Sequence, residues 1–242
     1  MASLPWSRYK KECSAEFVGT YLLVLFGAGS VIISASISGT IALVFVACVF
    51  GGTVALVILL LGRHSGAHIN PAVTLAHAFA KKTRSDLILP YVTFQALGAI
   101  LAAFTLRLFF LNRSVMPADL GSTELAVGVT PIYGIFLEAI GTFLLCSAAL
   151  VATFYVRQSG RQAALMGGTL FLLILLLGHL TGASFNPARS IGPALSSGHW
   201  SNIIVYLLGP FLGAVFAAMP FRLLHIEDQI REDYVVPIAR IQ

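Results

Sequence analysis

The chain has 242 residues, of which 57% are hydrophobic and only 10% are charged. Soluble domains carry about 25% charged residues, so this composition excludes an ordinary soluble globular protein, a disordered chain and a collagen. The formal net charge of +5 comes from short basic clusters between apolar stretches. That pattern is typical of a multispanning membrane protein and not of a nucleic-acid-binding face. Three cysteines without a pairing or ligand spacing predict neither a disulfide framework nor a metal site.

Six apolar stretches are long enough to cross a bilayer, which needs about 20 helical residues. In chain order they are residues 12–34, 41–61, 87–110, 131–156, 163–179 and 201–224. The fourth begins at Pro131, and proline is favoured at the first position of a helix. No small-residue cleavage site follows the first stretch, so we interpret it as a retained helix and not as a signal peptide.

Two further apolar pieces, residues 70–80 and 187–196, are too short to cross. Eleven helical residues extend only about 16 Å, so each piece is expected to enter and leave on one side. With a cytoplasmic N-terminus, six crossings place most basic clusters inside and only Arg107, Arg113 and Arg189 outside or at the outer ends. The positive-inside rule therefore predicts cytoplasmic termini, with the first piece entering from the cytoplasm and the second from outside. We expect an integral, multi-pass protein of the plasma membrane.

The two halves of the chain repeat. Glu16-Phe-Val-Gly-Thr20 returns as Glu138-Ala-Ile-Gly-Thr142, the segment SGAHINPAVT (65–74) as TGASFNPARS (181–190), and Leu97-Gly-Ala99 as Leu212-Gly-Ala214. Each unit has three crossings, an odd number, so the second copy is expected upside down in the membrane. Inverted repeats place their functional site at the midplane, where discontinuous helices meet.

The expected organisation is an all-α membrane protein with six transmembrane helices and two re-entrant half-helices, built as an inverted repeat of two three-helix units. Its parts are a cytoplasmic N-terminal segment (1–11), the first repeat (12–110), an extracellular loop (111–130), the second repeat (131–225) and a cytoplasmic tail (226–242).

Each repeat contains one Asn-Pro-Ala tripeptide, which is made of Asn70, Pro71 and Ala72 in the first and of Asn186, Pro187 and Ala188 in the second. Asparagine is a preferred N-cap and proline a preferred first helical residue, so each tripeptide starts a helix abruptly inside the membrane. Irregular backbone at that depth is tolerated only where it is buried in protein or lines a wet cavity. We expect each asparagine to cap its helix with the side-chain oxygen and to offer its NH2 group to a pore.

These paired motifs and the order of the blocks around them resemble the aquaporin and aquaglyceroporin (major intrinsic protein) family over about residues 10–225. The resemblance implies the fold given above, one pore per subunit, a homotetramer in a lipid bilayer and no cofactor or nucleic-acid partner. It also implies a selectivity filter of four positions, Phe50, Ile174, Ala183 and Arg189. Pore-facing carbonyl groups are expected at Gly66, Ala67, His68, Gly182, Ala183 and Ser184.

The filter signals disagree about the solute. Ile174 stands where strict water channels often have histidine, and with Ala183 it should leave a wider and more apolar wall. Ser190 stands where glycerol facilitators typically have aspartate, which favours a water channel. The sequence therefore predicts a passive water channel that excludes protons and ions. It leaves open whether small neutral solutes such as glycerol, ammonia or a metalloid hydroxide also pass.

The other candidate residues are weighed against structural roles. Glu16 and Glu138 could relay protons, but their repeat-related positions favour bracing of the two re-entrant loops through backbone N–H groups. His179 is only seven residues before Asn186, so a loop role is favoured over a filter role. The remaining histidines share no ligand spacing and are expected to be ordinary interfacial residues: His64, His77, His199 and His225.

Three other functions compete with a channel. An ion- or proton-coupled secondary transporter also uses inverted repeats, but it needs a charged site at the midplane, where this chain offers Asn, Pro and Ala. An intramembrane enzyme would need a nucleophile–base pair or a metal cluster, and the sequence suggests neither. A structural junction protein is not excluded by the sequence, although an intact filter favours conduction.

Overall fold

The structure is a computed structural model that describes residues 9–37, 39–110 and 119–234, with side chains described as far as residue 224. The expected N-terminal segment, extracellular loop and C-terminal tail therefore lie partly outside the described residues. Within them the chain is all helical, and six helices are long and apolar enough to cross a membrane.

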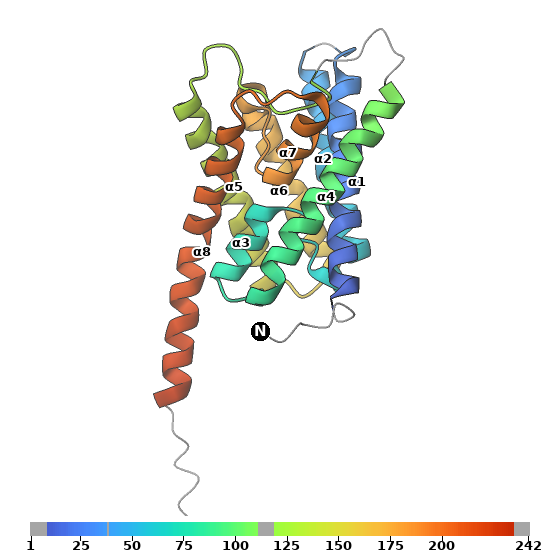
Figure 1. Ribbon diagram of the computed structural model, residues 1–242. Coiled ribbons are helices and arrows are strands. Elements are labelled where there is room, and N and C mark those ends of the chain that lie inside the picture. The colour runs from blue at the N-terminus through green and yellow to red at the C-terminus, as the bar shows by residue number, and fades with distance from the viewer. Residues whose placement is uncertain (1–8, 38, 111–118, 235–242) are drawn as a thin grey trace, which may run out of the picture.

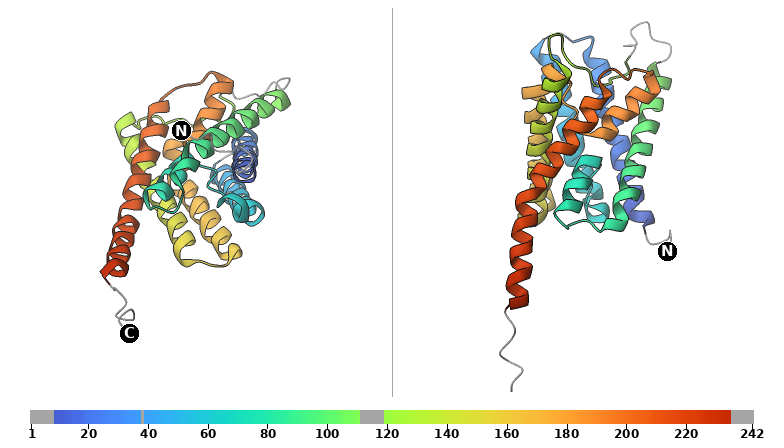
Figure 2. Two further views of the ribbon diagram at one scale, coloured as in Figure 1. Left: turned by 60° about the horizontal axis from the view of Figure 1, so that its bottom comes forward. Right: turned by 60° about the vertical axis from the view of Figure 1, so that its left-hand side comes forward.

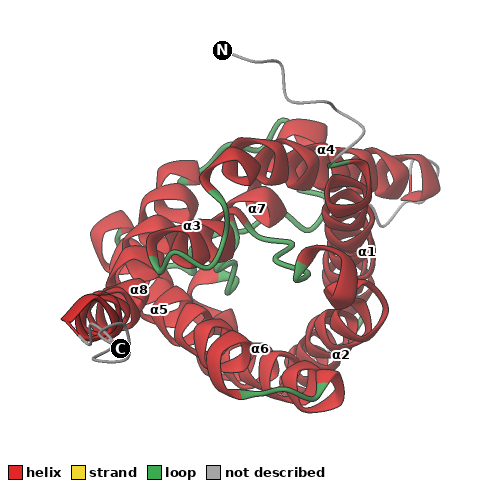
Figure 3. Cartoon of the chain, turned by 90° about the horizontal axis from the view of Figure 1, so that it is seen from below, coloured by secondary structure: helices red, strands yellow, loops and turns green. Residues whose placement is uncertain are grey.

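The elements follow the expected order, with one short helix in each half. They are α1 Lys10–Ser34, α2 Thr40–Ser65, α3 Pro71–Phe79, α4 Ser85–Phe110, α5 Pro131–Tyr155, α6 Ser159–Thr181, α7 Pro187–Ser197 and α8 Ile203–Tyr234. The short helices α3 and α7 lie one in each half of the bundle, between α4 and α8: α7 packs on α4 and α3 packs on α8 (Figures 1 and 3). α3 occupies the half of the bundle where α1 begins and α8 ends, and α7 occupies the opposite half (Figure 1). The predicted fold class is confirmed.

Packing of the long helices follows the repeat. α1 packs on α4 and α5 packs on α8, while α2 and α6 join the two halves. Gly98 and Gly213 make the two repeat-related contacts possible. A Cβ atom at Gly98 would lie 2.4 Å from the carbonyl oxygen of Phe17, and one at Gly213 would lie 2.2 Å from that of Ala139. Both glycines are therefore sites of close helix contact.

The helix ends differ from the predicted ones where backbone conformation, and not hydropathy, decides them. α2 and α6 continue to Ser65 and Thr181, where Gly66 (φ 84°) and Gly182 (φ 73°) end them in the left-handed conformation. His179 therefore lies exposed in the last turn of α6, and the predicted loop role is wrong. α8 was expected to end at residue 224, where the apolar stretch stops, yet its helix continues to Tyr234 and extends beyond the bundle (Figures 1 and 2).

Candidate functional site

Two loops lead into the short helices, and both have the same unusual backbone. In the first, Ala67 and Ile69 adopt φ values of 49° and 46°. In the second, Ala183 and Phe185 adopt 44° and 53°. Each such residue costs roughly 1 kcal/mol or more, so the surrounding contacts must hold the loops in place.

Glu16 of α1 supplies those contacts for the first loop. One carboxylate oxygen accepts hydrogen bonds from the Ser65 hydroxyl (2.6 Å) and the His68 N–H (2.9 Å), and the other accepts from the Ile69 N–H (2.6 Å). The Gln95 side chain of α4 also donates to this carboxylate at 2.7 Å. The side chain of Glu16 is fully buried.

Glu138 of α5 repeats the arrangement in the second half. Its carboxylate accepts hydrogen bonds from the Thr181 hydroxyl (2.7 Å), the Ser184 N–H (3.0 Å) and the Phe185 N–H (2.7 Å). Charge-assisted hydrogen bonds of this kind are stronger than neutral ones and compensate the burial of a carboxylate.

Further polar contacts to the loops were not predicted. The hydroxyl of Tyr91 donates to the carbonyl of Ser65 (3.0 Å), and that of Tyr206 donates to the carbonyl of Thr181 (2.9 Å). These tyrosines lie six residues before Leu97 and Leu212 of the repeated Leu-Gly-Ala blocks. That common spacing is the signal by which the sequence could have identified them.

Asn70 and Asn186 lie at the N-termini of α3 and α7 and join the two halves of the chain. The side-chain oxygen of Asn70 accepts from the Ala72 N–H (2.8 Å), and that of Asn186 accepts from the Ala188 N–H (3.0 Å). Their amide groups cross over: Asn70 Nδ2 donates to the Phe185 carbonyl and Asn186 Nδ2 to the Ile69 carbonyl, both at 2.8 Å. The NH2 groups are thus not wholly available to the pore, because one hydrogen of each is used between the loops.

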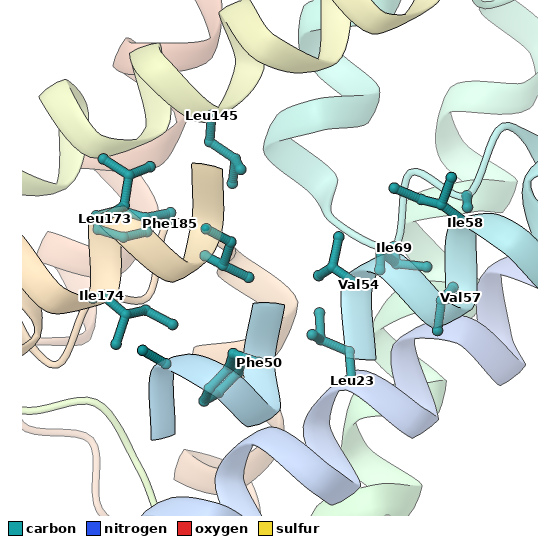
Figure 4. Close-up of a cluster of buried hydrophobic side chains, with 14 of the residues drawn as sticks. Leu23, Phe50, Val54, Val57, Ile58, Ile69, Leu145, Leu173, Ile174 and Phe185 are labelled. Atoms are coloured by element: carbon teal, nitrogen blue, oxygen red, sulfur yellow. The ribbon is translucent and has the colours of Figure 1, made fainter. Parts of the chain in front are cut away.

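A cavity of about 240 Å³ runs between the short helices and the long ones, from Phe50 and Arg189 past both asparagines to Gln162. Most of its polar lining comes from the loops and short helices, and most of its apolar lining comes from the long helices. Polar lining groups come from the loops, the short helices and the α5–α6 end: His68, Asn70, His77, Thr153, Gln162, Ser184, Asn186 and Arg189. The apolar lining includes Leu23, Val54, Ile58 and Leu145, several of which are drawn in Figure 4.

The loop carbonyls expected to face the pore have no hydrogen-bond donor among the described residues. This holds for the residues Gly66, Ala67, His68, Gly182, Ala183 and Ser184. Gly66, Ala67, His68 and Ser184 line the cavity, whereas Gly182 and Ala183 are not among its lining residues.

The four expected filter residues lie near one end of the cavity. Phe50, Ile174 and Ala183 belong to one buried apolar cluster (Figure 4), and the guanidinium carbon of Arg189 lies 5.3 Å from the centre of the Phe50 ring. Phe50 and Arg189 line the described cavity, but Ile174 and Ala183 do not. Arg189 is 2% exposed and donates to the Gly121 carbonyl (2.9 Å). Its Nε–H has no partner among the described residues.

His77 does not lie at an interface, so that expectation is wrong. It is buried in α3, bonded to the carbonyl of Val73 and to Thr153, with its ring 4.4 Å from that of His68. The half-helix is only nine residues long, so its last turn stays within the bundle, where α3 packs on α8, α4 and α5. His64 is exposed beside Arg63, His199 lies 3.6 Å from Glu124, and the side chain of His225 lies outside those described.

Comparisons with known proteins identify the family. Residues 4–221 match the family described as "Major intrinsic protein". Aquaporin NIP1-1 of Zea mays is 40% identical over 217 residues, which cover 89% of this chain and 75% of the relative. Aquaporin AqpM of Methanothermobacter marburgensis is 34% identical over 241 residues, covering 90% and 98%.

A solved structure shares the fold. The X-ray structure of the aquaglyceroporin from Plasmodium falciparum superposes with a TM-score of 0.82 at 23% identity, covering 91% of this chain and 99% of that one. The predicted family and the expectation of a channel rather than an enzyme are confirmed. The chain belongs to the major intrinsic protein family, and it is a membrane channel for water or small solutes.

Proposed function

We propose that this chain is a passive water channel that also passes small neutral solutes and excludes ions and protons. The observation that carries the proposal is the cavity whose lining combines the apolar side chains of the long helices with Asn70, Asn186 and Arg189. These polar groups replace the hydrogen bonds that a solute loses on leaving bulk water. The apolar lining offers no competing partner, so passage stays fast.

Exclusion of charge follows from the helix ends. α3 and α7 each present an N-terminus, with about half a positive charge, to the middle of the cavity, and Arg189 adds a full charge at one end. No carboxylate lines the described cavity, since Glu16 and Glu138 are fully buried behind the loops, so a cation or hydronium ion finds no acidic group to bind there. This is the exclusion generally described for aquaporin-type pores.

The roles of the remaining residues are part of the same proposal. Phe50, Ile174, Ala183 and Arg189 form the selectivity filter, the free loop carbonyls form a row of acceptors, and the two glutamates brace the loops. We also propose a homotetramer in the plasma membrane with cytoplasmic termini. The solute class rests on the apolar side chains of Ile174 and Ala183, which lack the polar ring that strict water channels often place at the first of these positions, so we expect glycerol, ammonia or a metalloid hydroxide to pass.

The test is permeation through proteoliposomes that contain the full chain. Vesicles are shrunk with impermeant sucrose to measure water flow and then exposed to glycerol to measure re-swelling. We expect shrinkage well above that of empty vesicles, followed by rapid glycerol entry. Shrinkage no faster than in empty vesicles would overturn the water channel, and shrinkage without re-swelling would overturn the wide filter.

A substitution in the proposed filter tests whether Ile174 determines glycerol permeability. Ile174→His introduces a polar ring that reaches further from the backbone, so glycerol entry should fall by about tenfold while water flow changes much less. Ile174→Leu keeps the apolar volume and is the matched control. Equal glycerol entry through the two variants would show that Ile174 does not set the width of the pore.

A further inference from the structure

Two arginines outside the proposed pore occupy equivalent places in the repeats. Arg107 lies ten residues after Leu97, and Arg222 lies ten residues after Leu212, so both have the same position relative to the repeated Leu-Gly-Ala block. Arg107 is in the last turn of α4, and Arg222 lies near the end of the membrane-spanning part of α8. Basic residues at these points would ordinarily be interpreted as interfacial anchors.

Each arginine instead reaches the outer end of the short helix from the other repeat. Arg222 Nη1 donates to the carbonyl of Phe79, the last residue of α3, at 3.3 Å, and its guanidinium lies 4.8 Å from the centre of the Phe79 ring. Arg107 Nη1 donates to the carbonyl of Ser196, one residue before the end of α7, at 2.5 Å. Thus α8 of the second repeat packs on α3 of the first, and α4 of the first repeat packs on α7 of the second.

Arg222 donates to the Phe79 carbonyl, which accepts no hydrogen bond from a described backbone N–H group. In the last turn of α3, the carbonyls of Ala76, His77 and Ala78 accept backbone N–H groups from residues 80–83. The Phe79 carbonyl accepts no backbone N–H among the described residues and bonds only to Arg222. A cation at this end of a helix also interacts favourably with the helix dipole.

We propose that Arg107 and Arg222 are positioning residues of the pore, and that each fixes the short helix of the opposite repeat along the channel axis. The N-termini of α3 and α7 meet at the crossed asparagine bonds, so a short helix that is held at its outer end cannot slide away from that meeting point. The positive-inside rule does not account for Arg107, because it lies at the outer end in the expected topology. This inference rests on the proposed channel function.

The two arginines should have different effects on selectivity. α7 carries Arg189 of the proposed filter, whereas the equivalent residue of α3 is Val73, 116 positions earlier, which carries no charge. Arg107→Met should therefore change the ratio of glycerol to water permeability by about two- to fivefold. Arg222→Met should lower water permeability per folded protein by a similar factor and leave the ratio unchanged.

The experiment measures both permeabilities in proteoliposomes, normalised to the amount of folded protein. Arg161→Met is the matched control, since the side chain of Arg161 is exposed and bonds to no other described residue. Lysine at either position keeps the positive charge. Arg107→Lys should therefore recover at least half of the change in the permeability ratio, and Arg222→Lys at least half of the lost water permeability. If a methionine variant does not fold, Arg107→Gln or Arg222→Gln removes the positive charge with a polar side chain and carries the same comparison. Permeabilities equal to those of Arg161→Met, or an equal change of ratio in both variants, would overturn the proposal.

A second measurement does not depend on transport. In amide hydrogen exchange of the detergent-solubilised protein, Arg222→Met should raise exchange in α3 and not in α7, and Arg107→Met should do the reverse. If wild-type vesicles conduct no water but this crossed pattern is found, the channel proposal fails and the positioning role stands. Unchanged exchange in both short helices would overturn the positioning role alone.

Discussion

At the scale of single residues, buried charge is balanced by hydrogen bonds in this protein. Glu16 and Glu138 form no ion pair with any described lysine or arginine, and each carboxylate instead accepts donors from one loop. Two of those donors in each loop are backbone N–H groups of residues directly before the asparagine cap. These hydrogen bonds connect each carboxylate to the strained backbone that leads into a short helix, which supports the proposed bracing role.

Replacing either carboxylate by an amide should destabilise the fold. In Glu16→Gln or Glu138→Gln, an NH2 group must face donors that previously met an oxygen, so we expect the free energy of unfolding to fall by about 2–4 kcal/mol. Denaturant unfolding in detergent measures this. Glu12→Gln, one turn earlier on α1, is the control, because Glu12 is partly exposed. Equal stability of the Glu12 and Glu16 variants would contradict the bracing role.

Arg189 is the residue on which ion exclusion should depend most. It is a buried cation that lines the cavity, and its Nε–H has no partner among the described groups. Arg189→Val removes the charge from one end of the cavity, so proton and cation flux should rise above the background of the wild type. A pH-sensitive dye in proteoliposomes measures it, with Arg161→Val as control. Flux at background would mean that the helix ends alone exclude charge.

At the scale of elements, close approach of helices fixes the bundle that surrounds the cavity. The glycine contacts of α1 with α4 and of α5 with α8 leave no space for a methyl group, since the nearest atoms are backbone oxygens. Backbone cannot rotate away as a side chain can, so a clash there must separate the two helices.

Gly213→Ala should therefore destabilise the protein by about 1–3 kcal/mol, through displacement of α8 from α5. Gly168→Ala is a matched control, because a Cβ atom at Gly168 would meet no atom within 4 Å and alanine favours a helix. Thermal unfolding of the two variants in the same detergent compares them. A melting temperature for Gly213→Ala equal to that of Gly168→Ala would show that the close contact is not needed.

The elements were largely predictable because hydropathy and the repeated blocks are local signals. The six crossings and the two short helices all have counterparts in the structure, and Asn70 and Asn186 cap as their side-chain chemistry requires. The crossed asparagine bonds and the burial of His77 were not predictable, since they depend on how elements more than 70 residues apart meet. Hydropathy also predicted the wrong end for α8, because the end of an apolar stretch indicates where the chain leaves the membrane and not where the helix ends.

At the scale of the whole molecule, the two ends of the bundle differ and their orientation can be tested. Val127 is fully exposed and follows Ala126, whose N–H donates to the Leu180 carbonyl at the end of α6, whereas the exposed Ser159 is the first residue of that helix. In a Cys48→Ser background, which removes the one exposed cysteine of those described, a membrane-impermeant maleimide on intact cells should label Val127→Cys. It should label Ser159→Cys only after permeabilisation. The reverse pattern would contradict cytoplasmic termini.

The crossed bonds between the halves have a consequence for synthesis of the chain in the membrane. Asn70 leaves the ribosome 115 residues before Phe185, whose carbonyl it bonds, and Arg222 follows Phe79 by 143 residues. At roughly 5–20 residues per second, each partner arrives on the order of ten seconds later. The first half thus waits in the bilayer with a half-helix whose two ends lack their final partners. A chain that stopped after α4 would lack every one of these bonds, so the first half alone cannot hold its short helix as the full chain does.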